Sequence, residues 1–214
     1  NIEYIVFNNL NTISQAGSNI SGGVNFYESD VKMTNCSFNN IKSEDAINIV
    51  RSKFSINECS FSNSESDSID IDFSEGNLSN LIFENSGNDA IDISSGMINI
   101  KNVTIKYSGD KGISIGENSL VTLDGFNIFK AKIGIAVKDK STLYIGGDSF
   151  YKNLINDSEI GIAVYQKKPE FGPAEVHIGN RSDIYTNLIL NNTNKHFIVE
   201  KNSFLELGNQ EFLN

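Results

Sequence analysis

Apolar and polar residues alternate along most of this chain in short runs that are typical of β-strands. The clearest run is AIDIS at 90–94, in which two isoleucines alternate with Ala90, Asp92 and Ser94. Successive side chains of a strand point to opposite faces, so the isoleucines are expected to face a core and the other three residues to face outward. No segment keeps the apolar period of an amphipathic helix for long. The pattern predicts an all-β protein.

The same unit recurs along the chain at a fixed spacing. Units of this type begin every 22 residues, at Ala46, Ser68, Ala90, Gly112 and Gly134. A second apolar pair, such as Cys36 with Phe38 and Leu81 with Phe83, recurs at nearly the same interval. Short strands, stacked aliphatic residues and the lack of a helical segment predict a single-domain parallel β-helix with coils of about 22 residues. The fixed leucine pattern of leucine-rich repeats, the competing fold at this period, is absent.

The register weakens towards the C-terminus. We expect β-helix coils over residues 1–180 and irregular final strands over residues 181–214, which cap the same domain because an open solenoid end exposes unpaired strand edges. The repeat also lengthens once, since the two IGIAV segments at 133–137 and 160–164 are 27 residues apart. We expect the insertion near Asn156, Asp157 and Ser158.

The coils resemble a known family. The series EDAINI, SDSIDIDF, GNDAIDISSG, GDKGISIGENS, IGIAVKDKS and AVYQKKPEFGPA is similar to the right-handed parallel β-helix repeats of the pectin-lyase-like superfamily. It also resembles bacterial β-helix proteins and domains, some of them associated with CotH-type proteins. The resemblance covers Gly23 to about Ala174 and implies a right-handed coil, while a fold alone transfers little activity.

The alternation sorts one outward face into three columns of small or polar residues. The first column contains Ala46, Ser68, Ala90, Gly112, Gly134 and Gly161; the second Asn48, Asp70, Asp92, Ser114, Ala136 and Ala163; the third Val50, Asp72, Ser94, Gly116, Lys138 and Tyr165.

Asp70, Asp72 and Asp92 are the sharpest candidates for chemistry on this face. Asp70 and Asp92 are expected one coil apart, and Asp70 and Asp72 about 7 Å apart along one strand. Like charges this close raise each other's pKa or attract a cation, so the three side chains suit acid–base catalysis on a polysaccharide, a calcium site, or a solvated acidic surface. Calcium is the one metal that this donor set suggests, and no cofactor is required.

Other features weigh against catalysis. Polygalacturonase-like β-helices carry catalytic aspartates on an outward strand face, but their NTD, DD, His and RIK-like segments have no counterpart here, and the DPHD signature of mannuronan epimerases is absent. The two histidines, His177 and His196, lie far along the chain, and His177 is interpreted as a surface strand residue. No EF-hand loop or calcium-binding β-roll repeat occurs.

A second candidate segment is YQKKPEFGPAE, at 165–175, which holds both prolines of the chain. The prolines stiffen a loop from which side chains are expected to project beside the small-residue columns. The expected substrate-binding residues are Lys138, Tyr165, Lys167, Lys168 and Phe171. The alternative is a loop that only covers the side of the solenoid.

Several polar and sulfur-containing residues have a structural interpretation. Asp45, Asp67 and Asp89 stand at strand entrances, where a turn Asp commonly accepts hydrogen bonds from backbone amides. A stacked ladder at a turn is predicted for Asn9, Asn40, Asn63 and Asn85. Cys36 and Cys59 occupy equivalent inward sites and are expected to be stacked thiols rather than a disulfide, because neighbouring strand positions rarely fit disulfide geometry.

The charge of the chain limits its partners. Asp and Glu number 27 against 17 Lys and Arg, which gives a formal net charge of −10 and argues against nucleic acid or an anionic membrane surface. No segment approaches the length of an apolar membrane span, and the chain begins without an initiator Met or a signal peptide, so we expect part of a larger polypeptide.

Together these features predict a binding or scaffold domain of a bacterial surface or secreted protein, which engages a polysaccharide or another cell-surface component along its acidic face. The alternative is a polysaccharide hydrolase or lyase that uses Asp70, Asp72 and Asp92. Extended solenoid faces suit long ligands.

Overall fold

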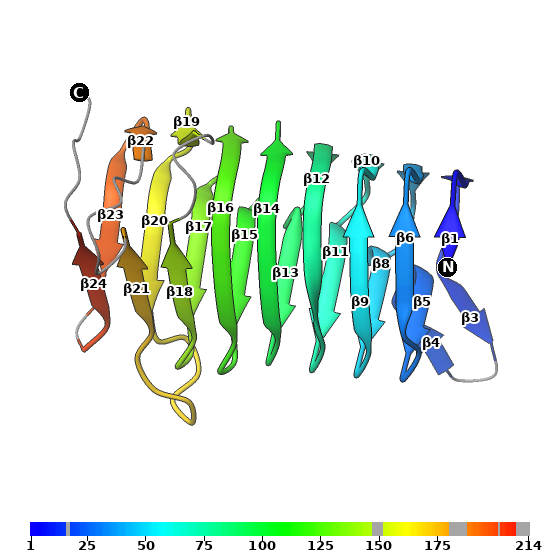
Figure 1. Ribbon diagram of the computed structural model, residues 1–214, viewed down its shortest axis with the longest axis horizontal. Helices are drawn as coiled ribbons and strands as arrows, with labels where there is room; N and C mark the ends of the chain where they lie inside the picture. The colour runs from blue at the N-terminus through cyan, green and yellow to red at the C-terminus, as the bar shows by residue number, and fades with distance from the viewer. Residues whose placement is uncertain (16–17, 147–151, 180–187, 201, 209–214) are drawn as a thin grey trace.

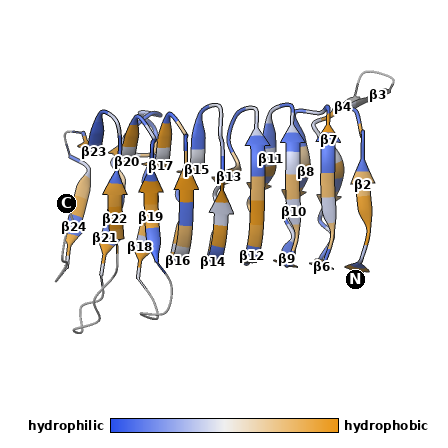
Figure 2. Ribbon diagram, turned by 90° about the horizontal axis from the view of Figure 1, so that it is seen from above, coloured by the Kyte–Doolittle hydropathy of each residue, from blue (hydrophilic) through white to orange (hydrophobic). Residues whose placement is uncertain are grey.

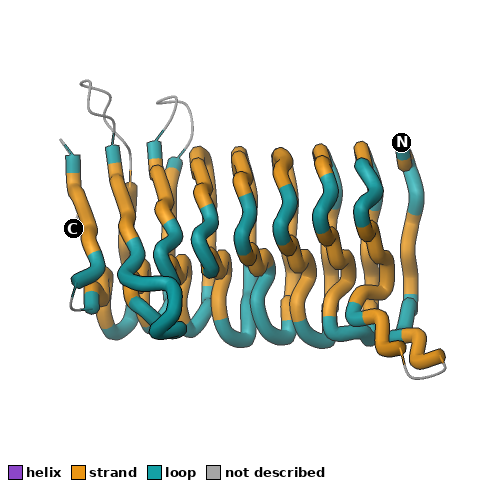
Figure 3. The backbone as a smooth tube through the Cα atoms, turned by 90° about the horizontal axis from the view of Figure 1, so that it is seen from below, coloured by secondary structure: helices purple, strands orange, loops and turns teal. Residues whose placement is uncertain are grey.

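The computed structural model describes residues 1–15, 18–146, 152–179, 188–200 and 202–208. Throughout this part the chain forms strands and turns, and Figure 3 shows no helix in it. The strands lie side by side along one long axis, with β1 and β24 at opposite ends (Figure 1). The predicted all-β solenoid is confirmed.

One wall of the solenoid is an eight-stranded parallel sheet, and its outer surface is called the acidic face below. Its strands, in spatial order, are β5 (Gly22–Tyr27), β8 (Asp45–Val50), β11 (Asp67–Asp72), β13 (Ile91–Ser94), β15 (Lys111–Gly116), β17 (Ile133–Lys138), β20 (Ile160–Tyr165) and β23 (Lys195–Val199).

The other two walls belong to one bent sheet. The second wall contains β1 (Ile2–Glu3), β6 (Val31–Thr34), β9 (Lys53–Asn57), the first halves of β12 (Glu75–Ser86), β14 (Met97–Ile105) and β16 (Leu120–Phe129), then β18 (Thr142–Ile145), β21 (Glu175–Ile178) and β24 (Phe204–Leu207). The third contains β2 (Val6–Asn8), β7 (Ser37–Ile41), β10 (Ser60–Ser64), the second halves of the three long strands, β19 (Asn153–Asn156) and β22 (Leu188–Asn191). A hairpin of β3 (Ile13–Gln15) and β4 (Ser18–Ile20) lies near the N-terminal end (Figure 1).

Parallel in-register pairing stacks equivalent residues and so builds the core. Each isoleucine of one column pairs with its counterpart in the next coil, and all are fully buried: Ile47, Ile69, Ile91, Ile113 and Ile135. On the third wall Phe7, Phe38, Phe61 and Phe83 stack with ring centroids 4.6–4.9 Å apart. Figure 2 shows hydrophobic residues along the strands of every coil. The interior is therefore one continuous apolar stack.

The corners use backbone that turns through the left-handed region. Asn40, Asn63 and Asn85 have φ of 55°, 56° and 61°, a conformation that Asn tolerates better than most residues. The Asn63 carboxamide donates to Asn40 Oδ1, and that of Asn85 donates to Asn63 Oδ1, both at 3.0 Å. The predicted ladder is confirmed for these three residues, while Asn40 Nδ2 contacts Asn8 rather than Asn9.

A buried serine column was not predicted. Ser74 Oγ accepts the backbone N–H of Ser52 at 3.0 Å, and Ser141 Oγ accepts that of Ser119 at 3.1 Å. These serines stand at the corner between the acidic face and the second wall, where they satisfy amides that no strand pairs.

Cys36 and Cys59 are both free and buried, which confirms the predicted thiols. The Cys36 amide donates to Cys59 Sγ at 3.4 Å. Burial raises the pKa of the Cys59 thiol to about 11, so this sulfur is uncharged at neutral pH.

The position predicted for the insertion is wrong. Ile145 pairs with Leu123 at the regular repeat spacing, whereas Asn153 already pairs with Phe126 at the longer spacing of the two IGIAV segments. The extra residues therefore precede Asn153 rather than lying at 156–158. Near the C-terminus, β22, β23 and β24 pair in parallel with β19, β20 and β21. The described strands of 181–214 thus continue the coil, and their role as a cap stays a prediction.

The buried isoleucine column gives the first testable prediction. Ile91→Ala should lower the free energy of unfolding by about 2–5 kcal/mol, because it opens a cavity in the core. The control Ile82→Ala removes the same atoms from a side chain that is 45% exposed, and it should cost about 1 kcal/mol or less. Urea denaturation followed by circular dichroism measures both losses. Equal losses would contradict the burial assigned to Ile91.

Candidate acidic site

Three half-buried aspartates lie together at the middle of the acidic face. Asp70 on β11 pairs in register with Asp92 on β13, so the two carboxylates lie on adjacent coils. Asp72 follows on β11 and pairs with Ser94. The structure thus brings together the three predicted candidates, and it places Asn48 beside them, whose carboxamide donates to Asp70 Oδ2 at 2.9 Å.

The first of the predicted outward columns is wrong. Ala46, Ser68 and Ala90 are at most 1% exposed, and the space in front of Gly112 is filled by Ile128. The chain bends where these residues stand, so their side chains point into the corner against the third wall. Side chains of the second and third columns point away from the core, but Ser114, Ala136 and Ala163 of the second column are at most 3% exposed. The accessible part of this face is therefore the region around Asp70, Asp72 and Asp92.

The strand-entrance aspartates mainly hold neighbouring coils together, as predicted. Asp67 Oδ1 accepts the backbone N–H of Asp89 at 2.7 Å, and Asp89 Oδ1 accepts that of Lys111 at 2.8 Å. Asp45 differs, because its carboxylate accepts from the Asn48 side chain at 3.1 Å. The column ends at Lys111, whose ammonium lies 3.5 Å from Asp89 Oδ1.

The predicted ligand-contacting residues at the other end of the face are only partly accessible. Lys138 is 8% exposed, its chain lies over Gly116, and its ammonium donates to Ser114 Oγ at 2.8 Å. Tyr165 is half-buried. Lys167, by contrast, is exposed and can contact a charged ligand.

The loop between β20 and β21 extends beyond the neighbouring corners (Figure 1). A fully buried carboxylate holds it, since Asp139 Oδ1 accepts the backbone N–H groups of Lys167 at 2.7 Å and Lys168 at 2.6 Å. The Lys168 ammonium forms an ion pair with Glu117, and Phe171 is half-buried. The sequence pattern did not reveal Asp139 as the anchor of this loop, because it is one of several Asp residues beside a turn.

His177 lies on the outer surface of β21, on a different wall. Its ring stacks on Tyr144 with centroids 4.9 Å apart, and its Nδ1 lies 2.8 Å from Glu206 Oε2. His177 is thus on the surface, as expected, and does not belong to the acidic face.

A family model described as a right-handed beta helix region matches residues 45–204, which is 160 of the 214 residues. The chain belongs to the right-handed β-helix family. No curated protein and no solved structure matches it. Membership gives the handedness and the fold of this β-helix, and its ligand must be inferred from its side chains.

Burial gives the carboxylates of this β-helix unusual proton affinities. Desolvation raises the pKa of Asp70 to about 9, and the charges of Asp45, Asp72, Asp92 and Asp67 act in the same direction. Desolvation also raises the pKa of Asp67 to about 7, and it raises that of Asp72. Asp70 therefore carries a proton at neutral pH and can act as a hydrogen-bond donor.

One buried oxygen of the cluster has no hydrogen-bond partner among the described residues. Asp92 Oδ1 is buried and makes no hydrogen bond to any described residue. Among the described residues, no group of three or more His, Cys, Asp or Glu side chains is arranged to hold a metal ion, so the calcium prediction gains no support.

The same part of the β-helix has no helix of the length and apolar character needed to cross a membrane.

The raised pKa of Asp70 predicts how stability depends on pH. Below its ordinary pKa of 3.8 the carboxyl binds a proton in both the folded and the unfolded chain, so the contribution of Asp70 to the free energy of unfolding has its full value. Above that value the unfolded chain loses the proton while the folded chain keeps it, so stability should fall as pH rises towards about 9. Asp70→Asn should make this fall shallower, because the amide cannot ionise.

Chemical denaturation of the wild type and Asp70→Asn, at pH values between about 5 and 9, measures the two slopes. Glu75→Gln is the control, because it removes a carboxylate that is exposed on another wall. Identical slopes for all three proteins would show that Asp70 does not hold a proton in the folded state.

Proposed function

We propose that this β-helix is a binding or scaffold domain of a bacterial surface or secreted protein, and that it engages carbohydrate along its acidic face. The observation that supports the proposal is the in-register pair of Asp70 and Asp92 on the outer surface. Protonated Asp70 offers a donor beside carboxylate acceptors, and sugar hydroxyls both donate and accept. The cell-surface setting rests on the resemblance to bacterial β-helix proteins.

The structure changes the set of residues that the ligand is expected to touch. Lys138 is excluded because its ammonium is held by Ser114 under the surface. Asp70, Asp72 and Asp92 remain as the central contacts, and Lys167 is available on the loop at one end. An extended solenoid face of this kind suits a long ligand.

A glycan array, followed by calorimetry on the glycans that bind, tests the proposal. Asp92→Asn should weaken binding by about 10-fold or more, because a charge-assisted hydrogen bond to a sugar hydroxyl is lost. The matched control Asp157→Asn removes an exposed carboxylate from another corner, where the backbone φ of 56° accommodates Asn. Absence of glycan binding, or equal weakening by both variants, would leave only a scaffold role.

A second candidate function is polysaccharide cleavage, and the protonated state of Asp70 favours it. An acid that keeps its proton at neutral pH, on the coil next to a second carboxyl group, is the pairing that glycoside hydrolysis requires. The adjacent-strand spacing of about 5 Å matches the separation that favours retention of configuration.

Incubation with acidic and neutral polysaccharides, with calcium or with a chelator, tests this candidate. Hydrolysis releases reducing ends, and a lyase produces an unsaturated sugar that absorbs in the ultraviolet. Asp70→Asn and Asp92→Asn should each lower the rate by about 100-fold or more, since the first removes the general acid and the second removes the nucleophile of a retaining mechanism. No product from any polysaccharide, or full activity in both variants, would exclude catalysis at this face.

A further inference from the structure

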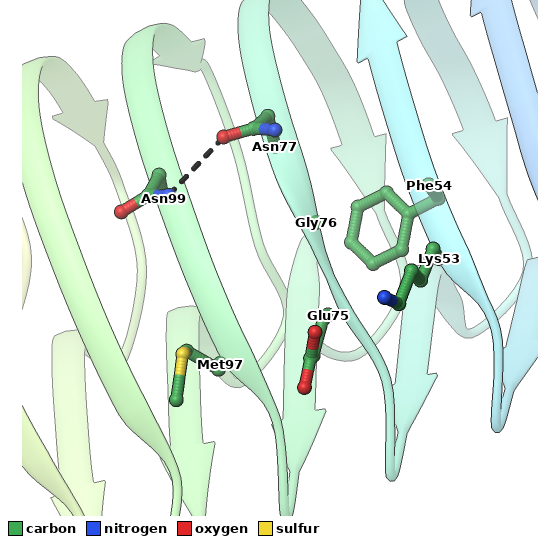
Figure 4. A pocket seen from close by; sticks show the side chains of 7 residues that line it. All are labelled: Lys53, Phe54, Glu75, Gly76, Asn77, Met97 and Asn99. Atoms are coloured by element: carbon green, nitrogen blue, oxygen red, sulfur yellow. Dashed lines mark hydrogen bonds between the residues drawn. The ribbon is translucent and has the colours of Figure 1, made fainter.

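Three shallow hollows meet on the outer surface of the second wall, next to its corner with the acidic face, and together they are called the corner groove below. Each hollow measures about 300–340 Å³, and Lys53 lines all three. Figure 4 shows the hollow in which Lys53 and Glu75 lie near Phe54, Asn77 and Met97. The corner groove is not part of the acidic face, and a ligand can bind there whether or not carbohydrate binds the acidic face.

An arginine is held in position at one end of the corner groove. The Arg51 guanidinium lies 5.9 Å from the centroid of the Tyr27 ring and 5.6 Å from that of Phe73, on the neighbouring coils. Its Nη1 also donates to the Tyr27 hydroxyl at 2.9 Å. These contacts fix the guanidinium and leave most of its N–H donors free for a ligand.

The cations of the corner groove form no ion pairs within the described part of the chain. Neither Arg51 nor Lys53 forms an ion pair with any described residue, and Lys32, which lines an adjoining hollow, forms none either. Two carboxylates lie beside them. Asp30 accepts the Lys53 backbone N–H at 2.9 Å through Oδ1, and Glu75 pairs in register with Lys53. Because the three cations outnumber these two carboxylates in a chain of net charge −10, this surface is suited to an acidic ligand.

Large apolar side chains surround these cations. Tyr27 is 58% exposed, and Phe73 and Met97 are each 56% exposed. Phe73 also has a φ of 50°, an uncommon conformation for a bulky residue, and this conformation places its ring at the surface. Exposed Tyr, Phe, Met and Arg side chains are the types enriched at protein–protein interfaces and their hot spots.

We propose that the corner groove binds an acidic peptide segment of a partner protein. Carboxylates of the peptide pair with Arg51 and Lys53, and its apolar side chains pack on Phe73 and Met97. Asn77 and Asn99 line the same hollow, and the Asn99 carboxamide donates to Asn77 Oδ1 at 3.2 Å, which leaves the Asn77 Nδ2 group to donate to the peptide backbone. A neutral glycan fits less well, because it offers no carboxylate to Arg51 and Lys53.

The repeat supplies substitutions that the backbone already accepts. Glu28 occupies the same corner position as Arg51 one coil earlier, with a φ of 46° against 48°. Ser95 follows Phe73 at that position, with a φ of 56°. Arg51→Glu and Phe73→Ser should therefore leave the fold intact, and thermal unfolding verifies this.

The test is selection of a library of random short peptides on the immobilised protein, followed by fluorescence anisotropy with each selected peptide. Selected peptides should carry at least two carboxylates beside an aliphatic or aromatic residue. Arg51→Glu combined with Lys53→Glu should weaken their binding by at least about 10-fold, and binding should weaken further at high salt. Phe73→Ser should weaken it by about 5-fold or more, because apolar contact is lost.

The matched control is Lys42→Glu combined with Lys132→Glu, which makes the same change in net charge at exposed positions outside the corner groove. It should leave peptide affinity within about 2-fold of the wild type. Three results would each overturn the proposal: no peptide is enriched, the peptides bind both double variants equally, or an acidic oligosaccharide occupies the corner groove while peptides do not.

Discussion

Each coil of this protein must place its residues directly on their counterparts in the next coil. Parallel strands in register are about 4.8 Å apart, so a side chain contacts the equivalent side chain before it contacts anything else. The spacing favours residues that interact well with copies of themselves. Isoleucines and phenylalanines pack, and carboxamides donate to one another along a column, as Asn63 and Asn85 do.

In-register stacking of equivalent residues is unfavourable for aspartate, because it places like charges side by side. Asp70 and Asp92 pair in register, and Asp67 stands between Asp45 and Asp89 in the adjacent column. Burial, and after it repulsion between the stacked carboxylates, raises the pKa of Asp67 and Asp70, and protonation relieves part of this repulsion. The columns then change residue type. Lys111 ends one of them, and Ser114, held by the ammonium of Lys138, ends the other.

Stacking is also why the fold was predictable from the sequence. A regular period assigns every residue a column, and the isoleucine column, the asparagine ladder and the paired thiols follow from it. The serine column was predictable in principle, since Ser52 and Ser74, like Ser119 and Ser141, are one repeat apart. The prediction from strict alternation that Ala90 faces outward was wrong, because the chain bends there and points the side chain inward.

The candidate site was predictable only where it repeats. The aspartates were located because their columns are periodic, whereas the anchoring of the loop by Asp139 occurs once and involves backbone groups of residues that the period does not place. Burial of Lys138 depends similarly on the small size of Gly116, over which its side chain lies. Contacts made once, between long side chains and loops, are set by three-dimensional packing rather than by the repeat.

The corner between the acidic face and the second wall separates two surfaces of different character. Asp72 faces outward on the acidic face, Phe73 turns the chain through the left-handed region, and Glu75 already belongs to the next wall. One coil earlier Val50, Arg51 and Lys53 follow the same path. A turn of two or three residues thus separates a cation of the corner groove from an aspartate column in the sequence. The two nevertheless lie on different walls of the solenoid. The side chain at the turn itself packs inside neither wall. It can therefore vary from Glu28 to Arg51 to Phe73 without disturbing the core. The corner groove could thus acquire its aromatic and basic residues independently of the acidic face.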